Sequence, residues 1–183
     1  MESENIATAV FAGGCFWCTE AVFKRISGVK EVVSGYTGGH VKNPAYREIC
    51  SGTTGHAEAV KIVYDKNRVS YTTLLEIFFA THDPTTLNRQ GNDVGTQYRS
   101  GIFYTDDTQK AAAEDYIRML EAQKVFPGKL VTEIAPLEIF YEAEEDHQDY
   151  YAQHGSQPYC QVIIKPKLKK LQQHYSHTLK TDV

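Results

Sequence analysis

The chain has 183 residues, of which 42% are hydrophobic and 23% charged, with a formal net charge of −4. This length and apolar share fit a single globular domain over residues 1–183 and exclude disordered, collagen-like and repeat architectures, while the acidic balance disfavours nucleic acid as a partner. No apolar run approaches the roughly 18 residues of a membrane span, and the N-terminus is acidic before it is apolar, so we expect a cytoplasmic protein without membrane contact.

The first half of the chain predicts strands and helices in alternation. From Cys15 the apolar spacing is helical, which predicts a helix to about Ser27 with Gly28 as its stop. Ser70 is a candidate N-cap for a second helix that ends before Pro84. A short apolar run ended by two glycines, and two later stretches of β-branched alternation, predict strands at residues 6–11, 29–36 and 56–64.

The second half begins with a long loop, residues 83–99, and loops of this length inside a domain are often functional. A strand is predicted at 101–104 and then a helix capped by Asp106 or Asp107. The remaining predicted elements are an extended segment at 132–140 and a short helix at 144–153. The pattern favours a two-layer α+β fold, with a doubly wound parallel sheet as the main alternative.

The C-terminal segment, residues 165–183, differs from the rest in charge. It carries five Lys and one Asp, a net +4, which leaves −8 for the residues before it. We interpret it as a basic tail, partly ordered or forming a solvated face, in preference to a polyanion-binding segment.

Four cysteines are too few to form a stabilising disulfide framework in a reducing compartment. We therefore consider first that these thiols are reactive or bind a metal. Cys15 follows a Gly pair at the predicted helix start, where backbone N–H groups favour a thiolate. Cys18 lies one helical turn further on. The intervening Phe16 and Trp17 offer an apolar binding surface.

The Cys15/Cys18 spacing leaves several chemistries open. It fits a redox pair, half of a zinc site, or a nucleophile with an unrelated neighbour. His56 and Glu58 match the H-x-E of zinc deaminases, but the order relative to the C-x-x-C is reversed and the strand-like context disagrees. Cys50 lacks a Gly-Gly or helix-start signal, and we expect it to be a buried structural thiol.

Five ordered segments resemble the A-type peptide methionine sulfoxide reductases and cover most of the chain from Phe11 to Cys160. They are Gly14-Cys15-Phe16-Trp17, Ser34-Gly35-Tyr36-Thr37-Gly38-Gly39, Thr54-Gly55-His56-Ala57-Glu58-Ala59-Val60, Gly95-Thr96-Gln97-Tyr98-Arg99-Ser100, and Ala143-Glu144 with His147-Gln148.

The resemblance implies a single catalytic domain that reduces the S epimer of methionine sulfoxide, free or in proteins. It implies a ferredoxin-like two-layer α+β sandwich with added segments, no cofactor or metal, and a monomer recycled by thioredoxin. The implied site residues are Cys15 as nucleophile, Glu58, Tyr46 and Tyr98 as partners of the sulfoxide oxygen, and Phe16, Trp17 and Asp93 in the substrate pocket.

The chemistry gives its own reason for a glutamate there. The sulfoxide oxygen needs a proton donor, and a Glu held in an apolar pocket has a raised pKa that keeps it protonated. Tyrosine hydroxyls can then bind the oxygen as charge develops on it. Taken singly, each of these residues is more often an ordinary structural residue. We expect His147 to cap or stabilise the last short helix, with orienting a partner in the site as the alternative.

Reduction would leave Cys15 as a sulfenic acid, which condenses with a second thiol. The resemblance favours Cys160 as this resolving cysteine, with Cys18 as the alternative. The vicinity of Gly155 and Pro158 predicts a mobile loop that brings Cys160 to the site. No cysteine follows Cys160, so an external dithiol would reduce the disulfide on Cys15 directly.

Three other classes of function compete with the reductase. A general dithiol oxidoreductase would use Cys15 and Cys18, although the enclosed Phe-Trp is atypical of such motifs. A non-catalytic module could bind sulfoxide- or methionine-containing peptides through the aromatic pocket. A cysteine peptidase is the least favoured, because no acid or amide partner can be assigned to any His.

Overall fold

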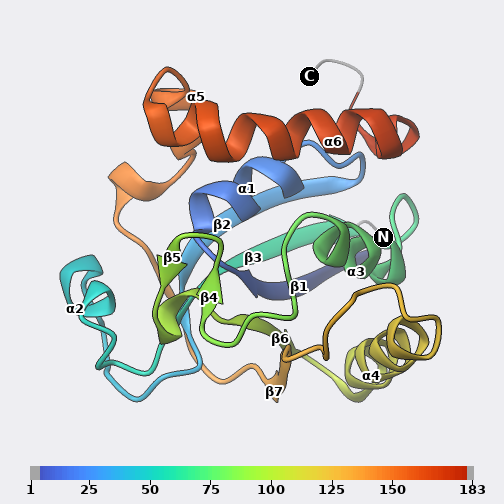
Figure 1. The fold of residues 1–183 in the computed structure, drawn as a ribbon, viewed down its shortest axis with the longest axis horizontal. Coiled ribbons are helices and arrows are strands. Elements are labelled where there is room, and N and C mark those ends of the chain that lie inside the picture. Colours follow the sequence, from blue (N-terminus) through green and yellow to red (C-terminus); the bar gives the residue numbers. More distant parts are fainter. Residues whose placement is uncertain (1–4, 181–183) are drawn as a thin grey trace.

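A six-stranded sheet organises the computed structural model, which describes residues 5–180 (Figure 1). Its strand order is β7-β6-β1-β3-β2-β8, and every neighbouring pair is antiparallel except β6 and β7. The doubly wound parallel alternative is therefore wrong, and the fold is a mixed α/β one. The strands are β1 (Ile6–Gly13), β2 (Val29–Thr37), β3 (Ala57–Asp65), β6 (Ser100–Tyr104), β7 (Glu133–Pro136) and β8 (Phe140–Glu142).

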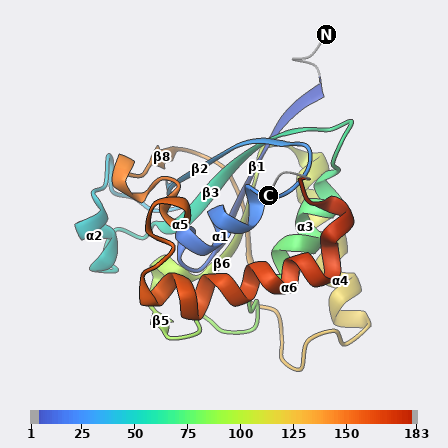
Figure 2. The same ribbon diagram turned by 90° about the horizontal axis from the view of Figure 1, so that it is seen from above.

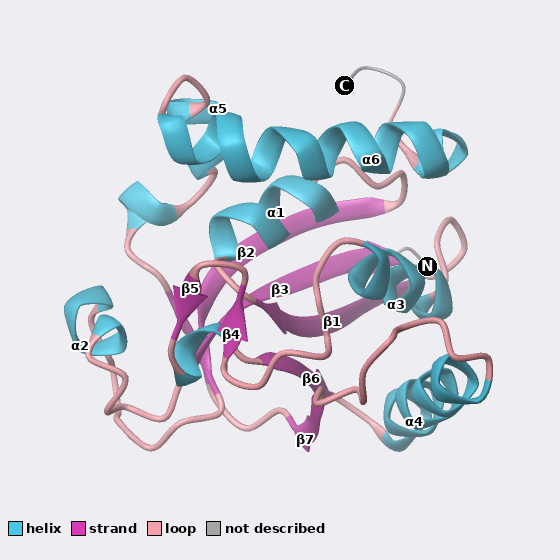
Figure 3. Cartoon of the chain, in the orientation of Figure 1, coloured by secondary structure: helices cyan, strands magenta, loops and turns pink. Residues whose placement is uncertain are grey.

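Helices surround this sheet, and a small hairpin lies near one end of it (Figure 3). In two perpendicular views α6 runs across α1 (Figures 1 and 2), and the two helices are in contact. The helices are α1 (Phe16–Phe23), α2 (Tyr46–Cys50), α3 (Tyr71–Ala80), α4 (Asp107–Ala122), α5 (Tyr150–His154) and α6 (Lys165–Tyr175), and the hairpin strands are β4 (Arg89–Gln90) and β5 (Asp93–Val94).

The apolar core has two parts, one on each face of the sheet. The larger cluster joins the sheet to α1, α3, α4 and α6 and includes Phe11, Phe23, Phe78 and Leu171. The smaller cluster, around Phe103, is covered by the segment that carries β7 and β8. The central strands β1 and β3 are therefore mostly buried, whereas the edge strands β7 and β8 are partly exposed.

Local sequence signals set the helix ends. The Ser70 hydroxyl accepts a hydrogen bond from the Thr73 N–H at 3.1 Å, and Asp106 accepts one from the Gln109 N–H at 2.8 Å, so both predicted caps are confirmed. The first helix ends at Phe23, earlier than the predicted Ser27.

The basic segment is helical rather than a frayed tail as far as Tyr175. Leu168 and Leu171 of α6 are buried, whereas most of its lysines are exposed, and residues 181–183 lie outside the described part. A π-helical turn, Cys160–Ile164, leads into α6. Pro166 explains the wider turn, because proline lacks an N–H and its ring would clash with the Val162 carbonyl of a regular α-helix.

No helix within residues 5–180 combines the length and apolar character needed to cross a membrane.

A partly buried histidine joins α3 to β6. His82 Nδ1 lies 2.5 Å from the Phe78 carbonyl oxygen and Nε2 lies 2.8 Å from the Ser100 hydroxyl. The neutral ring satisfies both contacts, by donating from Nδ1 to the carbonyl and accepting at Nε2. Burial lowers the pKa of His82 to about 4.

This lowered pKa predicts that stability falls in mild acid. The unfolded chain binds a proton at His82 near its ordinary pKa and the folded chain resists it, so the stabilisation is present above that ordinary pKa and is lost as the pH falls towards 4. We expect His82 to remove about 2 kcal/mol of unfolding free energy between pH 7 and pH 5. Urea unfolding of His82→Gln should show a correspondingly flatter pH dependence, while exposed His174→Gln should match the parent; equal slopes in all three would contradict this.

Candidate active site

Cys15 occupies the N-cap position of α1, directly after the glycines that end β1. Gly14 adopts a φ of +93°, and a Cβ there would lie 2.6 Å from the Gln90 side chain. Only glycine fits this turn, which places the thiol against the open end of the helix. Cys15 is 8% exposed, so the predicted strand, Gly-Gly and helix-start arrangement is confirmed with a nearly buried thiol.

Glu58 on β3 holds the first turn of α1 in place. Its Oε1 accepts the Phe16 N–H at 3.1 Å, and the side chain is 1% exposed. Its Oε2 is buried and has no hydrogen-bond partner among the described residues. Burial raises the pKa of Glu58 to about 8, so at pH 7 most of its carboxyl groups are protonated. Next to Cys15, this side chain is a proton donor.

Two tyrosines face the same carboxyl group. Tyr46 begins α2, and Tyr98 ends a 3₁₀ turn, Thr96–Tyr98, in the long predicted loop. Both are half-buried, and burial followed by the charge of Glu58 raises the pKa of each above its ordinary value. Both hydroxyls therefore stay protonated and can donate hydrogen bonds to an oxygen held beside Glu58.

An aromatic wall completes this side of the site. Trp17 stacks on Tyr150 with ring centroids 3.8 Å apart, and its Nε1 donates to Nδ1 of His147 at 3.2 Å. The His147 ring lies 4.1 Å from that of Tyr46. His147 thus connects the apolar and the hydroxyl-bearing parts of the site, a role different from the expected support of the last short helix.

The segment that carries His147 is anchored to β2 and α2. Glu144 accepts hydrogen bonds from the Tyr36 hydroxyl at 3.1 Å and the Tyr46 N–H at 3.0 Å. The Gln148 side chain pairs with the backbone of Ser34, accepting from its N–H at 2.9 Å and donating to its carbonyl at 2.8 Å. The side-chain amide imitates a strand partner, and it fixes the position of His147 next to Trp17.

The C-terminal segment also reaches the thiols, and the Tyr159 ring packs edge-on against Trp17. The Tyr159 hydroxyl lies 3.6 Å from Cys18 Sγ and donates to Asp93 Oδ2 at 2.9 Å. A hollow of about 370 Å³ lies here, and both thiols, Asp93, Tyr159 and Lys167 line it. The structure thus places Asp93 at the thiols, together with a tyrosine that the sequence did not single out.

Cys15 and Cys18 share a hydrogen bond, and their pKa values move in opposite directions. Burial and this hydrogen bond raise the pKa of Cys15 well above its ordinary value. The hydrogen bond from Cys15, helped by the charge of Lys167, lowers the pKa of Cys18 to about 7. The helix start alone therefore does not make Cys15 a thiolate as expected, because its burial outweighs the backbone N–H of Trp17. A thiolate at Cys18 can instead accept the proton of Cys15.

The other two cysteines differ from expectation. Cys50 is exposed at the end of α2, so the prediction of a buried structural thiol is wrong; this short helix buries only Ile49. Cys160 is fully buried in the π-helical turn and not in a loop. Burial raises the pKa of Cys160, and the charge of Cys18 raises it further.

The zinc interpretation finds no support in the geometry. His56 accepts the Gly39 N–H at Nδ1, 3.0 Å, and its Nε2 lies 2.6 Å from the Val41 carbonyl oxygen, so both ring nitrogens hold the loop after β2. Among residues 5–180, no three His, Cys, Asp or Glu side chains are grouped as metal ligands.

Sequence reasoning missed the roles of Tyr159 and Tyr150, and it noted Glu144 only as part of a family segment. All three lie in the polar, aromatic-rich stretch from 141 to 159, and nothing in its periodicity separates a site residue from a surface one. Their signal is a tertiary one, the contacts with Trp17, Cys18 and Tyr46 described above.

A nearly buried thiol at a helix start, a second thiol one turn away and a neutral carboxyl group beside them are the elements of a thiol-based redox enzyme. The comparisons with known proteins narrow this class. The family described as peptide methionine sulfoxide reductase matches residues 7–179, and the chain belongs to this family.

Individual relatives and solved structures align with between 80% and 94% of this chain. Peptide methionine sulfoxide reductase MsrA of Saccharolobus solfataricus is 55% identical over 172 residues, 94% of this chain and 96% of that protein. The reduced form of Mxr1 from Saccharomyces cerevisiae has a TM-score of 0.76 and 34% identity, covering 86% of this chain and 90% of that one. Mxr1 in complex with Trx2 has a TM-score of 0.53 and 25% identity, covering 80% and 86%.

The raised pKa of Glu58 is open to direct measurement. In a Cys15→Ser protein, we expect the carboxylic acid band of Glu58 to be present at pH 7 and to disappear around pH 8, because burial favours the neutral form. Infrared difference spectra against Cys15→Ser/Glu58→Gln isolate this band. A carboxyl group already ionised at pH 6 would contradict the assignment.

Proposed function

We propose that the chain reduces the S epimer of methionine sulfoxide, peptide-bound or free, to methionine, as a peptide-methionine (S)-S-oxide reductase in the repair of oxidative damage. The observation that carries this proposal is the neutral, buried Glu58 beside Cys15. A sulfoxide oxygen is a poor leaving group until it is protonated, and a carboxyl group with a pKa of about 8 supplies that proton at neutral pH.

The first chemical step transfers oxygen from the substrate to Cys15. As the Cys15 sulfur attacks the sulfoxide sulfur, its proton passes to the Cys18 thiolate and Glu58 protonates the oxygen. Tyr46 and Tyr98 donate hydrogen bonds to that oxygen as its charge grows. The substrate's sulfur–oxygen bond and the new sulfur–sulfur bond then break as the oxygen is transferred to the sulfur of Cys15, so the substrate leaves as a thioether, reduced by two electrons, and Cys15 becomes a sulfenic acid.

The substrate's methyl group is proposed to contact Phe16 and Trp17, and Asp93 is proposed to line the same pocket. Stacking on Tyr150 and the hydrogen bond to His147 hold Trp17, so the orientation of its ring towards the substrate is fixed. An apolar wall beside hydroxyl donors orients a sulfoxide by its two different substituents, and this supports selection of one epimer.

We propose Cys160 as the resolving thiol and Cys18 as the alternative. Resolution forms a disulfide with Cys15 and releases the oxygen as water. The Tyr159 contacts with Cys18 and Asp93 support a role for the C-terminal segment, and the π-helical turn offers a place where the helix can open to release Cys160. The hydrogen bond between Cys15 and Cys18 supports the alternative.

The disulfide is proposed to be reduced by thioredoxin, with no bound cofactor or metal. The yeast relative in complex with Trx2 supports this partner. No residue after Cys160 is a cysteine, so in this scheme thioredoxin attacks the disulfide on Cys15 directly.

We infer a ferredoxin-like core with added segments. Strands in the order β6-β1-β3-β2, with α1 and α3 in the crossing connections, support this description, and β7 and β8 are the additions. We also propose that residues 1–183 form one catalytic domain, a cytoplasmic monomer without nucleic-acid or membrane partners. The single large core that extends from β1 to α6 supports one domain, with the basic segment 165–183 partly built into it.

Cys15→Ser should abolish reduction of S-epimer methionine sulfoxide, because serine is too weak a nucleophile and cannot form a sulfenic acid. The fold should be unchanged, since the Cys15 side chain makes no cap hydrogen bond. Turnover with a chemical dithiol, with circular dichroism as the control for folding, checks both points. Retained turnover would rule out the proposed function.

Trapping the disulfide tests the resolving thiol. One equivalent of sulfoxide without reductant should link Cys15 to Cys160, joining tryptic peptides 1–24 and 130–167. Peptide mass analysis distinguishes this from a Cys15–Cys18 bridge, which stays within peptide 1–24. The second outcome would assign resolution to Cys18, and Cys160→Ser would then keep full turnover.

A further inference from the structure

Three neighbouring hollows lie in a row that begins at the thiols, and we refer to this row as the groove. The thiol hollow, about 370 Å³, shares Gln90 and Lys167 with a second hollow of about 360 Å³. The second shares Phe126 and Lys170 with a third hollow of about 490 Å³ between α3, α4 and α6. Because consecutive hollows share lining residues, the groove leads from Cys15 to a pocket remote from the chemistry, which we call the far pocket.

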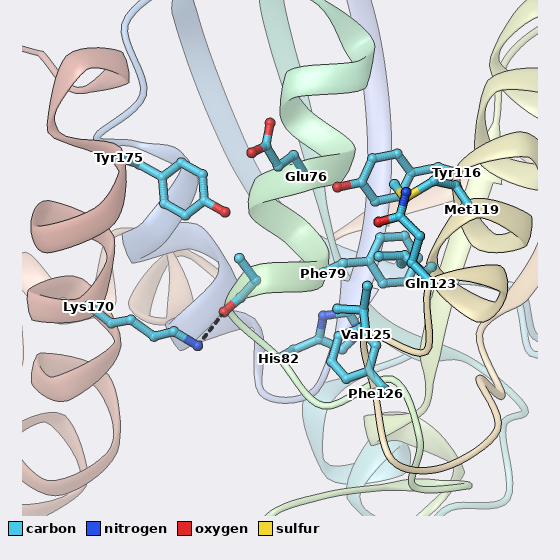
Figure 4. Close-up of a pocket in the computed structure, with 12 residues that line it drawn as sticks. Glu76, Phe79, His82, Tyr116, Met119, Gln123, Val125, Phe126, Lys170 and Tyr175 are labelled. Carbon is cyan, nitrogen blue, oxygen red and sulfur yellow. Dashed lines mark hydrogen bonds between the residues drawn. The ribbon is translucent and has the colours of Figure 1, made fainter.

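Apolar side chains form one wall of the far pocket, and polar side chains complete its lining. Figure 4 shows Phe79, Tyr116, Met119, Val125 and Phe126 gathered on one wall, opposite α6. Val125 is 52% exposed, although its neighbours in this pocket are apolar. Large apolar side chains gathered on a concave surface are typical of binding sites.

The charged groups along the groove are balanced. Lys170 donates to the Ala80 carbonyl oxygen at 3.0 Å, and Glu76 lines the same far pocket (Figure 4). Lys167 and Asp83 both line the middle hollow, and the Asp83 carboxylate already accepts hydrogen bonds from the backbone N–H and hydroxyl of Thr85. With cations and carboxylates in near balance, apolar contact rather than net charge selects the occupant.

We propose that this groove binds the polypeptide that flanks an oxidised methionine, and that the far pocket receives a large apolar side chain several residues away from it. The inference rests on the proposed function, and it assigns peptide segments with a neighbouring apolar residue as the favoured substrates. Free methionine sulfoxide can fill only the end of the groove at Cys15. An extended chain advances about 3.3 Å per residue and can continue along it.

A peptide scan tests this preference. Each peptide carries one S-epimer methionine sulfoxide in a Ser/Gly background and one Leu, placed two to six positions away on either side. Burying a leucine side chain predicts a rise in kcat/KM of about tenfold at one or two positions on one side, through KM and not kcat. A profile that is flat over all positions would overturn the proposal.

Matched variants locate the effect. Val125→Glu places a charge in the far pocket, and Ile139→Glu, at a residue 56% exposed between β7 and β8 and outside the three hollows, is the control. Val125→Glu should lose the leucine preference and keep the parent's activity on free methionine sulfoxide; Ile139→Glu should keep both. A leucine preference that survives Val125→Glu would reject the far pocket as its source.

The choice of reductant and of substrate decides between a peptide and thioredoxin as the occupant of the groove. The Val125→Glu assay is run once with thioredoxin and once with a chemical dithiol. A loss seen only with thioredoxin would assign the groove to that protein and overturn the proposal. Absence of activity on free and peptide sulfoxide alike in the parent would instead contradict the proposed function itself.

Discussion

The hydrogen bond from the Phe16 N–H to Glu58 is the contact on which the site depends. It joins the centre of the sheet to the first turn of α1, and so sets where Cys15 lies. Burial of this carboxyl group disfavours its charge, while the backbone N–H partly offsets that effect. A protonated carboxyl group near neutral pH results. The same interaction therefore positions the thiol and provides the acid beside it.

The remaining parts of the site come from segments far apart in the chain. His147 and Tyr150 hold Trp17 in place, and Tyr159 contacts Cys18. The Gln148 side chain holds the segment that carries His147 in place, because its amide forms hydrogen bonds with the backbone N–H and carbonyl of Ser34. Residues beyond 140 thus form much of the surroundings of a helix that begins at residue 16.

Sequence patterns predicted the elements well where capping and periodicity act locally. Ser70 and Asp106 cap their helices as expected, since a side-chain oxygen and a backbone N–H three residues later suffice. Sequence patterns did not predict features that depend on contacts between distant segments of the chain. Cys50 is exposed because its short helix buries only Ile49. Cys160 is buried because the helix it enters packs on α1, and Pro166 gives that helix a π-helical turn.

The sequence by itself determined the family, the Gly-Gly-Cys turn and the types of side chain needed for the chemistry, because these depend on residues close in the chain or on motifs in order. Only the tertiary structure decided the protonation of Glu58, the pairing of Cys15 with Cys18 and the groove that extends from them. The physical reason is that burial, hydrogen-bond partners and cavities arise from atoms that folding brings together from distant parts of the chain.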